Sequence, residues 1–384
     1  MTRVPVALEL FCGCGGLSTG LLNAGIRVAA GFDIDRRSIE AYEYNHSYRR
    51  ARGFVTDVSK VSGGELLERS GVDRIDLLAG GPPCQPFSIV GKRGGSNDER
   101  SGLVADFLRI AGELNPEAIL FENVPNFVTI DEGRHLEILV SGLQKLKYTV
   151  RSEVVAAADF GVAQIRRRFV LIAIRRARKV AFPKPSHRPL NALDGGGVPY
   201  VTTRDVLDDL PPAGDFGESG VYNHEPTEHT ADMLARFATL GVGKREKRSF
   251  HDRLHPDRPS YTLRAGTGNF SPLRPVHYRY DRVVTVRESA RLQGFGDEFI
   301  WPDAIPRLQQ YRQVGNAVPP PLAEAAARCI ADQLGWTLNS DDCRGDPQLR
   351  PAAITMTDDE RKARRQRMIR GASLGGQRQE AKRL

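Results

Sequence analysis

The sequence has few cysteines, no long apolar run and no internal repeat, and each absence excludes a class of protein. Its five cysteines among 384 residues are scattered and odd in number, which excludes a disulfide framework and favours a reducing compartment. No stretch reaches the roughly 18 to 20 apolar residues of a membrane span, and we expect no signal peptide. With 40% hydrophobic residues, the chain can bury a sizeable core, so we expect a globular cytoplasmic protein.

The charge is unevenly distributed along the chain. The net charge of +8 suggests a nucleic-acid partner only weakly, because residues 361–384 carry nine basic side chains and one acid. The preceding 360 residues hold 46 basic and 46 acidic side chains. Two stretches of this neutral body are positive, Gln164–Arg188 with nine bases and no acid, and Lys244–Arg291 with twelve bases and five acids. We expect both to line a cleft for a polyanion, and the tail to add salt-sensitive affinity.

Apolar runs alternate with helix-like stretches over the first 175 residues, which predicts a parallel sheet with crossover helices. Residues 181–304 are rich in Pro, Gly, His and Arg and predict a second, smaller, loop-rich domain. We therefore predict an α/β, Rossmann-like fold with a first segment over 1–180, a return over 305–337, and an irregular connector and disordered basic tail over 338–384. The expected strands are 4–10, 26–32, 75–79, 118–121 and 169–174, and the expected helices are 17–24, 36–45, 103–114 and, after the breaker Pro319-Pro320-Pro321, 322–334.

A glycine-rich loop, Phe11–Gly16, separates the first expected strand from its helix. Glycines there permit a tight turn and let backbone N–H groups approach a ligand at the helix N-terminus. Asp33 stands about 17 residues beyond the last glycine, near the spacing at which an acid binds ribose hydroxyls in nucleotide-binding folds. The order G-x-G-G favours an adenosine-type cofactor other than NAD, with a structural turn as the alternative. Cys12 and Cys14 lack a second cysteine pair, so we predict no metal site.

The segment Gly80–Ser88 reads Gly-Gly-Pro-Pro-Cys-Gln-Pro-Phe-Ser and follows an apolar strand. Its prolines stiffen the backbone and place Cys84 at the carboxyl edge of the sheet, where ligands bind in such folds. This position favours a nucleophile over a structural cysteine, which would more often lie within an apolar run. Residues 91–98 have the composition of a catalytic lid, with an ordinary surface loop as the alternative.

An acid and several arginines are predicted at the same edge. Glu122 ends an apolar strand, where a carboxyl group either caps a helix or has a pKa raised by burial, so that it can donate a proton. Arg166 and Arg168 precede another apolar strand, so some of these arginines must face a site or a polyanion.

Taken in order, these blocks resemble the DNA cytosine-5 methyltransferase family. Phe11–Gly16 resembles its S-adenosylmethionine loop, Gly81–Ser88 its Pro-Cys-Gln loop, and Glu122-Asn123-Val124 its Glu-Asn-Val block. The main departure is Ile34, where many members carry an aromatic residue. Further matches are Gln164-x-Arg166-x-Arg168, 258–262, 285–295 and 313–318, so that the anchors extend from about residue 4 to 336.

The resemblance implies methyl transfer from S-adenosylmethionine without a metal. Cys84 adds to C6 of cytosine, Glu122 protonates or hydrogen-bonds N3, and Arg166 and Arg168 hold the base and backbone, with Arg168 at the O2 edge. A base that the sequence does not identify, water among the candidates, then removes the C5 proton. The implied cofactor-binding residues are Phe11, Gly13, Cys14, Gly15, Gly16, Asp33, Ile34, Asp57, Val58, Pro83, Leu103, Asn316 and Val318. The implied DNA-binding residues are Gln85, Ser88, Lys92, Arg100, Gln164, Arg258 and Thr262.

The implied partner is double-stranded DNA, from which the cytosine must be flipped, while residues 177–255 would recognise the target. We expect a monomer, associated with the nucleoid through DNA, that works alone or beside a restriction endonuclease acting on the same site. One alternative is an RNA cytosine-5 methyltransferase, whose Cys-Phe-Thr signature is missing from the sequence. Another is a catalytically silent DNA-binding regulator, which the intact Cys84, Glu122, Arg166 and Asn316 disfavour. A nucleotide-dependent oxidoreductase would have no use for the Pro-Cys-Gln segment.

Overall fold

The computed structural model describes residues 4–83, 99–195, 197–214, 216–265 and 275–351. Its centre is a seven-stranded sheet in the order β3-β2-β1-β4-β5-β8-β6. The first five strands are parallel, whereas β8 is antiparallel to both β5 and β6. The predicted all-parallel sheet is therefore wrong at β8. The strands are β1 (Val6–Leu10), β2 (Arg27–Asp33), β3 (Arg52–Val55), β4 (Leu77–Gly80), β5 (Ala118–Asn123), β6 (Tyr148–Ala156) and β8 (Arg167–Arg175).

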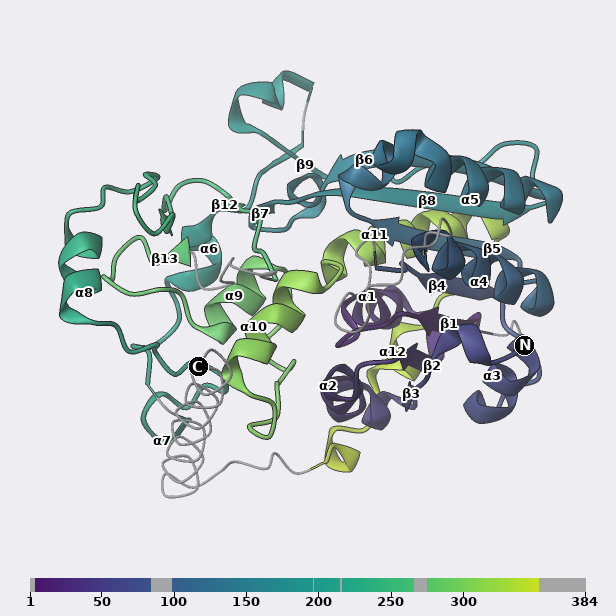
Figure 1. The fold of residues 1–384 in the computed structure, drawn as a ribbon, viewed down its shortest axis with the longest axis horizontal. Coiled ribbons are helices and arrows are strands. Elements are labelled where there is room, and N and C mark those ends of the chain that lie inside the picture. The colour runs from purple at the N-terminus through teal and green to yellow at the C-terminus, as the bar shows by residue number, and fades with distance from the viewer. Residues whose placement is uncertain (1–3, 84–98, 196, 215, 266–274, 352–384) are drawn as a thin grey trace, which may run out of the picture.

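Helices cover both faces of the sheet (Figure 1). Alternate residues of a strand point to opposite faces, so Leu77 and Ala79 of β4 join one core and Leu78 joins the other. The result is the predicted α/β architecture with three layers. The first face carries α1 (Gly16–Ala24), α2 (Arg36–His46) and α11 (Pro320–Leu334), and the second carries α3 (Gly63–Ser70), α4 (Glu99–Leu114) and α5 (Arg134–Lys145).

Local sequence signals fix several helix ends. The Asp35 side chain accepts hydrogen bonds from the Arg37 and Ser38 backbone N–H groups and so caps α2. Ser62 and Glu65 form a capping box at α3. Of the three prolines that we expected to precede α11, Pro319 is its N-cap, whereas Pro320 and Pro321 belong to its first turn, where a backbone N–H has no partner within the helix.

A second, loop-rich lobe lies beside the sheet (Figure 1), and its paired strands are only two residues long. Its core includes Trp301 and Tyr311 together with Cys14 and Ala41 of the first domain, so the lobe packs directly against the glycine-rich loop. Its elements are β7 (Gln164–Ile165), β9 (His187–Arg188), β10 (Val198–Pro199), α6 (Thr203–Leu207), α7 (Phe216–Ser219), α8 (Ala231–Ala238), β11 (Asp252–Arg253), β12 (Ser260–Tyr261), β13 (Pro275–Val276), α9 (Val286–Leu292) and α10 (Arg307–Asn316).

Short 3-10 helices connect these elements: η1 (Ser47–Arg49), η2 (Val58–Lys60), η3 (Pro125–Val128), η4 (Ile130–Gly133), η5 (Ala157–Phe160), η6 (Leu190–Gly195) and η7 (Pro347–Leu349). Among the described residues, no helix combines the length and the apolar character that a membrane crossing requires.

The predicted irregular connector after α11 contacts the first domain as far as Arg350. It contains α12 (Ser340–Arg344), in which Cys343 is buried. The Arg350 guanidinium lies over the Tyr44 and Tyr48 rings, 5.1 and 5.2 Å from their centroids. It also donates a 2.8 Å hydrogen bond to Asn45 Oδ1, so the connector is fastened to the end of α2. Residues 352–384, which include the predicted basic tail, lie outside the described residues.

Candidate active site

The glycine-rich loop is fixed by the acid at the end of β2. Asp33 Oδ2 accepts a 2.8 Å hydrogen bond from the Gly13 N–H, and its Oδ1 accepts one of 2.8 Å from the Asp35 N–H. Burial raises the pKa of Asp33, although these hydrogen bonds lower it in part. Phe11, Gly13 and Gly15 have φ angles of 56°, 54° and 94°, a left-handed turn that glycine adopts readily. The predicted loop and acid are therefore brought together.

This loop leaves room for a ligand. A Cβ on Gly13 would have no atom within 4 Å, and Ile34, which follows Asp33, is 51% exposed. An open glycine turn beside a carboxylate and an exposed apolar side chain fits the ribose and adenine of a nucleoside cofactor. Among the described residues, no group of His, Cys, Asp and Glu side chains is arranged to hold a metal ion.

The residues at the end of α10, although distant in sequence, pack against the glycine-rich loop. A Cβ on Gly16 would collide with the Val318 carbonyl oxygen, so only glycine lets the loop approach this closely. Asn316, the last residue of α10, is exposed at this junction. Cys14 is buried in the core of the second lobe, with its Sγ 3.8 Å from the Gln313 carbonyl oxygen. The side chain of Cys14 therefore faces away from the loop, and a cofactor could contact only its backbone.

The other predicted cofactor residues range from exposed to fully buried. Asp57 caps η2, and its Oδ2 lies 2.9 Å from Lys60 Nζ. The hydrogen bond from the Ser59 hydroxyl and the nearby Lys60 lower the pKa of Asp57. Val58 is only 2% exposed and packs in a core, so a cofactor could contact only its backbone. Leu103 is half-buried in α4 and Pro83 is exposed.

Sequence reasoning missed a buried acid next to the glycine loop. Glu9 is 3% exposed, and its Oε2 accepts hydrogen bonds from the Ser18 N–H (2.9 Å) and from the Ser18 hydroxyl. That hydroxyl lies 2.9 Å from the Tyr42 hydroxyl. Burial, together with the nearby Asp33 and Glu122 carboxylates, raises the pKa of Glu9 to about 8, although the hydrogen bonds from Ser18 oppose the rise. The sequence feature that could have revealed Glu9 is its place as a lone acid within the apolar strand Val6–Leu10.

Two glycines bring the ends of β1, β4 and β5 together. A Cβ on Gly80 would collide with the Leu10 carbonyl oxygen, and one on Gly81 with the Glu122 carbonyl oxygen. Asn123 Nδ2 donates a 2.9 Å hydrogen bond to the Pro82 carbonyl oxygen. The beginning of the Pro-Pro-Cys segment is thus attached to the Glu-Asn-Val segment at one edge of the sheet.

Some predicted residues cannot be placed against this edge. Cys84, Gln85, Ser88 and Lys92 lie outside the described residues. Arg100 belongs to the first turn of α4, and its side chain is also outside the described part.

Glu122 lies at this edge as a buried acid beside an arginine. Arg168 Nε is 2.9 Å from Glu122 Oε1, and the two side chains are 10% and 13% exposed. Burial raises the pKa of Glu122, while the positive charges of Arg168 and Arg166 oppose that rise. Despite the short ion pair, Oε1 has no well-directed hydrogen bond within the described residues. This buried oxygen therefore keeps acceptor capacity beyond its ion pair with Arg168.

Comparison with known proteins identifies this arrangement. The family described as C-5 cytosine-specific DNA methylase matches residues 6–332. The chain belongs to this family. It is a DNA cytosine-5-methyltransferase, and its family and fold are those of S-adenosylmethionine-dependent methyltransferases.

The methyltransferase has curated relatives of similar length. It is 31% identical to the type II methyltransferase M1.HphI of Haemophilus parahaemolyticus, over 84% of this chain and 86% of that one. It is 32% identical to M.XorII of Xanthomonas oryzae, over 87% and 86%. Among solved structures, S. pombe Dnmt2 shares the fold with a TM-score of 0.64 at 20% identity, over 86% of this chain and all of that one.

In this methyltransferase, Arg166 and Gln164 are bonded to protein groups, and their contacts with base and DNA stay predictions. Arg166 is fully buried and donates to the carbonyl oxygens of Leu263 (3.0 Å) and Gly315 (2.7 Å). Gln164 is also fully buried, and its amide bonds to Gln293 Oε1 (2.7 Å) and the Leu263 N–H (2.9 Å). Both side chains use their donors to join the sheet to the second lobe. Arg258 and Thr262 are exposed, as DNA contacts require.

The two positive stretches do not line one cleft as predicted. Strand β8 places Arg168 at the catalytic edge, where Glu122 lies, and Arg175 at the opposite edge, because it runs antiparallel to β5 along the whole length of that strand. In the second stretch, six arginines form ion pairs with acids of the protein, which are Arg245–Asp252, Arg253–Asp281, Arg279–Asp208, Arg282–Glu288, Arg287–Asp297 and Arg291–Asp297. Exposed bases with no ion pair among the described residues are Lys244, Lys247, Arg248, Arg258 and Arg264.

Proposed function

We propose that this methyltransferase transfers a methyl group to C5 of a cytosine flipped out of a short, specific duplex site, through a covalent bond between Cys84 and C6. The observation that carries the proposal is Glu122, a buried acid that is ion-paired with Arg168 at the edge where the Pro-Pro-Cys segment begins. A stacked cytosine could not reach a carboxyl group that is only 13% exposed, so the base must leave the duplex.

The reaction needs C5 to become a nucleophile. The Cys84 thiolate adds to C6, and Glu122 gives a proton or hydrogen bond to N3, so that the ring accepts the electrons of the new bond. C5 would then form a bond to the methyl carbon as the bond from that carbon to the sulfonium sulfur breaks, with the electron pair of the broken bond staying on sulfur. A base, for which water is a candidate, removes the C5 proton, and the electrons of that C–H bond expel the Cys84 thiolate. Arg168 would stabilise the ionised form of Glu122 between turnovers and would contact the O2 edge of the cytosine.

The glycine-rich loop is the proposed site for S-adenosylmethionine, which supplies the methyl group on a sulfonium when it is bound. Asp33 would meet the ribose hydroxyls, because each of its oxygens retains a lone pair beyond the backbone hydrogen bond that it accepts. Ile34 would pack on the adenine with an aliphatic side chain. Backbone groups of Phe11–Gly16 and the exposed Asn316 would enclose the rest.

The proposed partner is duplex DNA, and a restriction endonuclease for the same site is the second component of the proposed system. The relatives named type II methyltransferases support this assignment. We propose that the enzyme acts as a monomer on DNA in the cytoplasm.

Base-resolution mapping of methylcytosine in DNA from cells that express the chain tests the proposed function. We expect 5-methylcytosine at one short motif and at no other. An RNA methyltransferase would instead leave the DNA unmodified and mark RNA, and a silent regulator would mark neither.

A hairpin of the second lobe is the proposed reader of that motif. Residues 244–253, the recognition hairpin, are closed by the hydrogen bond from the Arg253 N–H to the Lys244 carbonyl oxygen (2.9 Å) and by the Arg245–Asp252 ion pair (2.7 Å). At its base, the Tyr261 hydroxyl donates to the Gly243 carbonyl oxygen (3.2 Å). Tyr261 lies in β12, which pairs with β7 just before Arg166. The hairpin therefore projects from the region that adjoins the catalytic edge.

Replacing Lys247 and Arg248 together by alanine is expected to lower kcat/KM on the cognate duplex by about 30-fold or more, because each bidentate base contact is worth about 1–3 kcal/mol and two are removed. Both side chains are exposed at the hairpin tip. Steady-state methylation of a short duplex measures the effect. The matched control is the double variant Arg27→Asn plus Arg50→Asn, which removes two exposed charges beside β2 and β3. Equal losses in both variants would exclude the hairpin as the reader.

A further inference from the structure

The basic stretch that follows Arg168 extends to the side of the sheet opposite the catalytic edge. Strand β8 runs from Arg167 to Arg175, and a rise of about 3.3 Å per residue separates its ends by roughly 26 Å. Arg167 pairs with Ala156 at the last residue of β6, whereas Arg175 pairs with Tyr148 at its first. The bases after Arg175 therefore cannot contact a cytosine held by Glu122.

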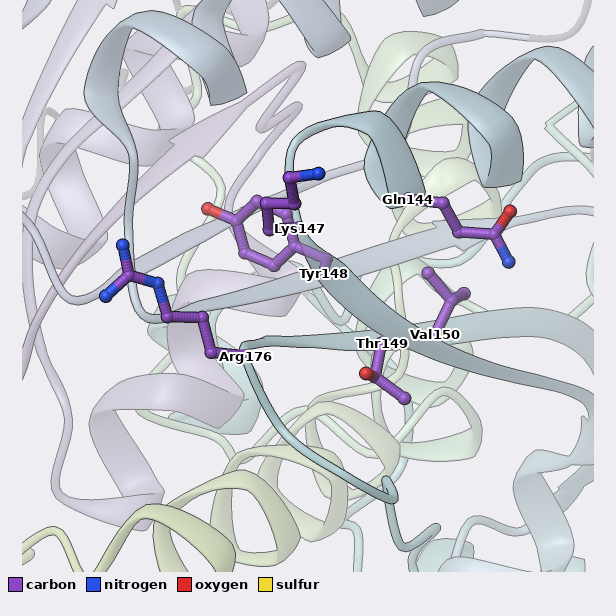
Figure 2. Close-up of a pocket in the computed structure, with 6 residues that line it drawn as sticks. All are labelled: Gln144, Lys147, Tyr148, Thr149, Val150 and Arg176. Carbon is purple, nitrogen blue, oxygen red and sulfur yellow. The ribbon is translucent and has the colours of Figure 1, made fainter.

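These bases meet a second basic segment, the turn between α5 and β6. The Arg176 N–H donates a 2.9 Å hydrogen bond to the Lys147 carbonyl oxygen. The Thr149 hydroxyl donates one of 2.5 Å to the Ala177 carbonyl oxygen. The two segments line an open pocket of about 740 Å³, and Figure 2 shows Lys147, Tyr148 and Arg176 gathered at one end of it. The two loops are thus held together as one surface.

This surface, the far-edge patch, consists of Lys145, Lys147, Arg175, Arg176, Arg178 and Lys179. None of the six has an ion pair within the part of the chain that the structure describes. The acid Glu117 adjoins the patch, because its carbonyl oxygen accepts a 3.0 Å hydrogen bond from the Arg175 N–H, and its Oε2 accepts one of 3.0 Å from Trp336 Nε1. Five of the six are exposed and Arg175 is half-buried, so the patch is a concentrated positive charge.

Backbone strain marks the two residues at the centre of the patch. Lys147 and Arg176 have φ angles of 69° and 57°, in the left-handed region where a side chain with a Cβ is disfavoured and Gly or Asn is the usual choice. Long cationic side chains occupy both positions instead. Because both strained positions carry a cationic side chain and lie next to each other, we infer that the two side chains share a function.

We infer that the far-edge patch binds the phosphates of a second duplex segment while the catalytic edge holds the first. DNA is the partner that the charge favours, because a cation-rich surface binds its backbone without regard to sequence. A long DNA molecule would supply the second segment from its own contour, and the enzyme would pass between segments without dissociating. This inference rests on the proposed function only in that the enzyme binds DNA.

The test uses the full chain bound to an immobilised short duplex that contains its site, and measures capture of a labelled second duplex across a salt series. The variant Lys147→Asn plus Arg176→Asn removes two charges and keeps residues that tolerate the left-handed conformation. We expect about a 10-fold loss of capture, and a salt dependence reduced by about 2 in log–log slope. Methylation of the short duplex should stay unchanged, which separates this inference from the proposed function.

The control is Arg27→Asn plus Arg50→Asn, in which Arg50 also has a left-handed φ of 62°. These residues flank β2 and β3, at the other end of the strand order from β8 and β6. Capture that is unchanged in the patch variant, or lost equally in the control, would overturn the inference. So would a wild-type enzyme that captures no second duplex at low salt, in which case an acidic protein would become the candidate partner.

Discussion

Replacing Cys84 by alanine is expected to abolish methyl transfer while DNA binding stays measurable. Without a thiolate to add to C6, C5 of cytosine remains a poor nucleophile, and no other group of the proposed mechanism supplies that bond. Removal of a nucleophile from a catalytic unit lowers turnover by on the order of 10⁴-fold or more. Transfer of a labelled methyl group to duplex DNA measures the activity, and gel retardation measures the binding.

The matched control is Cys329→Ala. Cys329 is half-buried on α11, and its Sγ lies 3.5 Å from Gln333 Nε2, away from the glycine loop. This variant should retain near wild-type activity, because the side chain contacts no part of the proposed site. If Cys84→Ala instead kept substantial turnover, the covalent mechanism would be wrong, and direct methylation or another nucleophile would have to be considered.

The sequence predicted most of the first domain because its strands are short and fully buried. Expected strands at 118–121 and 169–174 correspond to β5 and β8. Strand β6 was missed because Tyr148–Ala156 mixes Thr, Arg, Ser and Glu with apolar residues, as an edge strand can. The reversed direction of β8 could not be deduced, because antiparallel pairing with β5 is decided by tertiary packing and leaves no local signal.

The candidate site was predictable where a short sequence motif determines the backbone conformation. The left-handed loop at Gly13 and Gly15 and the position of Asp33 follow directly from residue type and spacing. Side-chain roles were harder to predict. Arg166 and Gln164 belong to a conspicuous polar motif, yet both are fully buried and bonded to protein, because the second lobe needs polar connections to the sheet. A sequence cannot distinguish an arginine that faces DNA from one that satisfies buried carbonyl groups.

Replacing Glu122 by glutamine is the second change with a large expected effect. Glutamine keeps the shape of the side chain and can donate a hydrogen bond to N3, but it cannot transfer a proton. Loss of general acid catalysis lowers rates by about 10²–10⁴-fold, so we expect kcat to fall by that amount with DNA binding retained. Stopped-time methylation at saturating DNA measures kcat. Glu117→Gln, the same change just before the other end of β5, is the control that should leave kcat unaltered.

The pH dependence separates a proton donor from a merely structural acid. Burial raises the pKa of Glu122 above its ordinary value, and the active form of a proton donor is the protonated one. Wild-type kcat should therefore decline as the pH rises through that pKa, whereas the glutamine variant, which does not titrate, should lack this decline at a lower plateau. A variant that lost activity equally at every pH, with a matching fall in Tm, would show that Glu122 supports the fold and that the proton reaches N3 by another route.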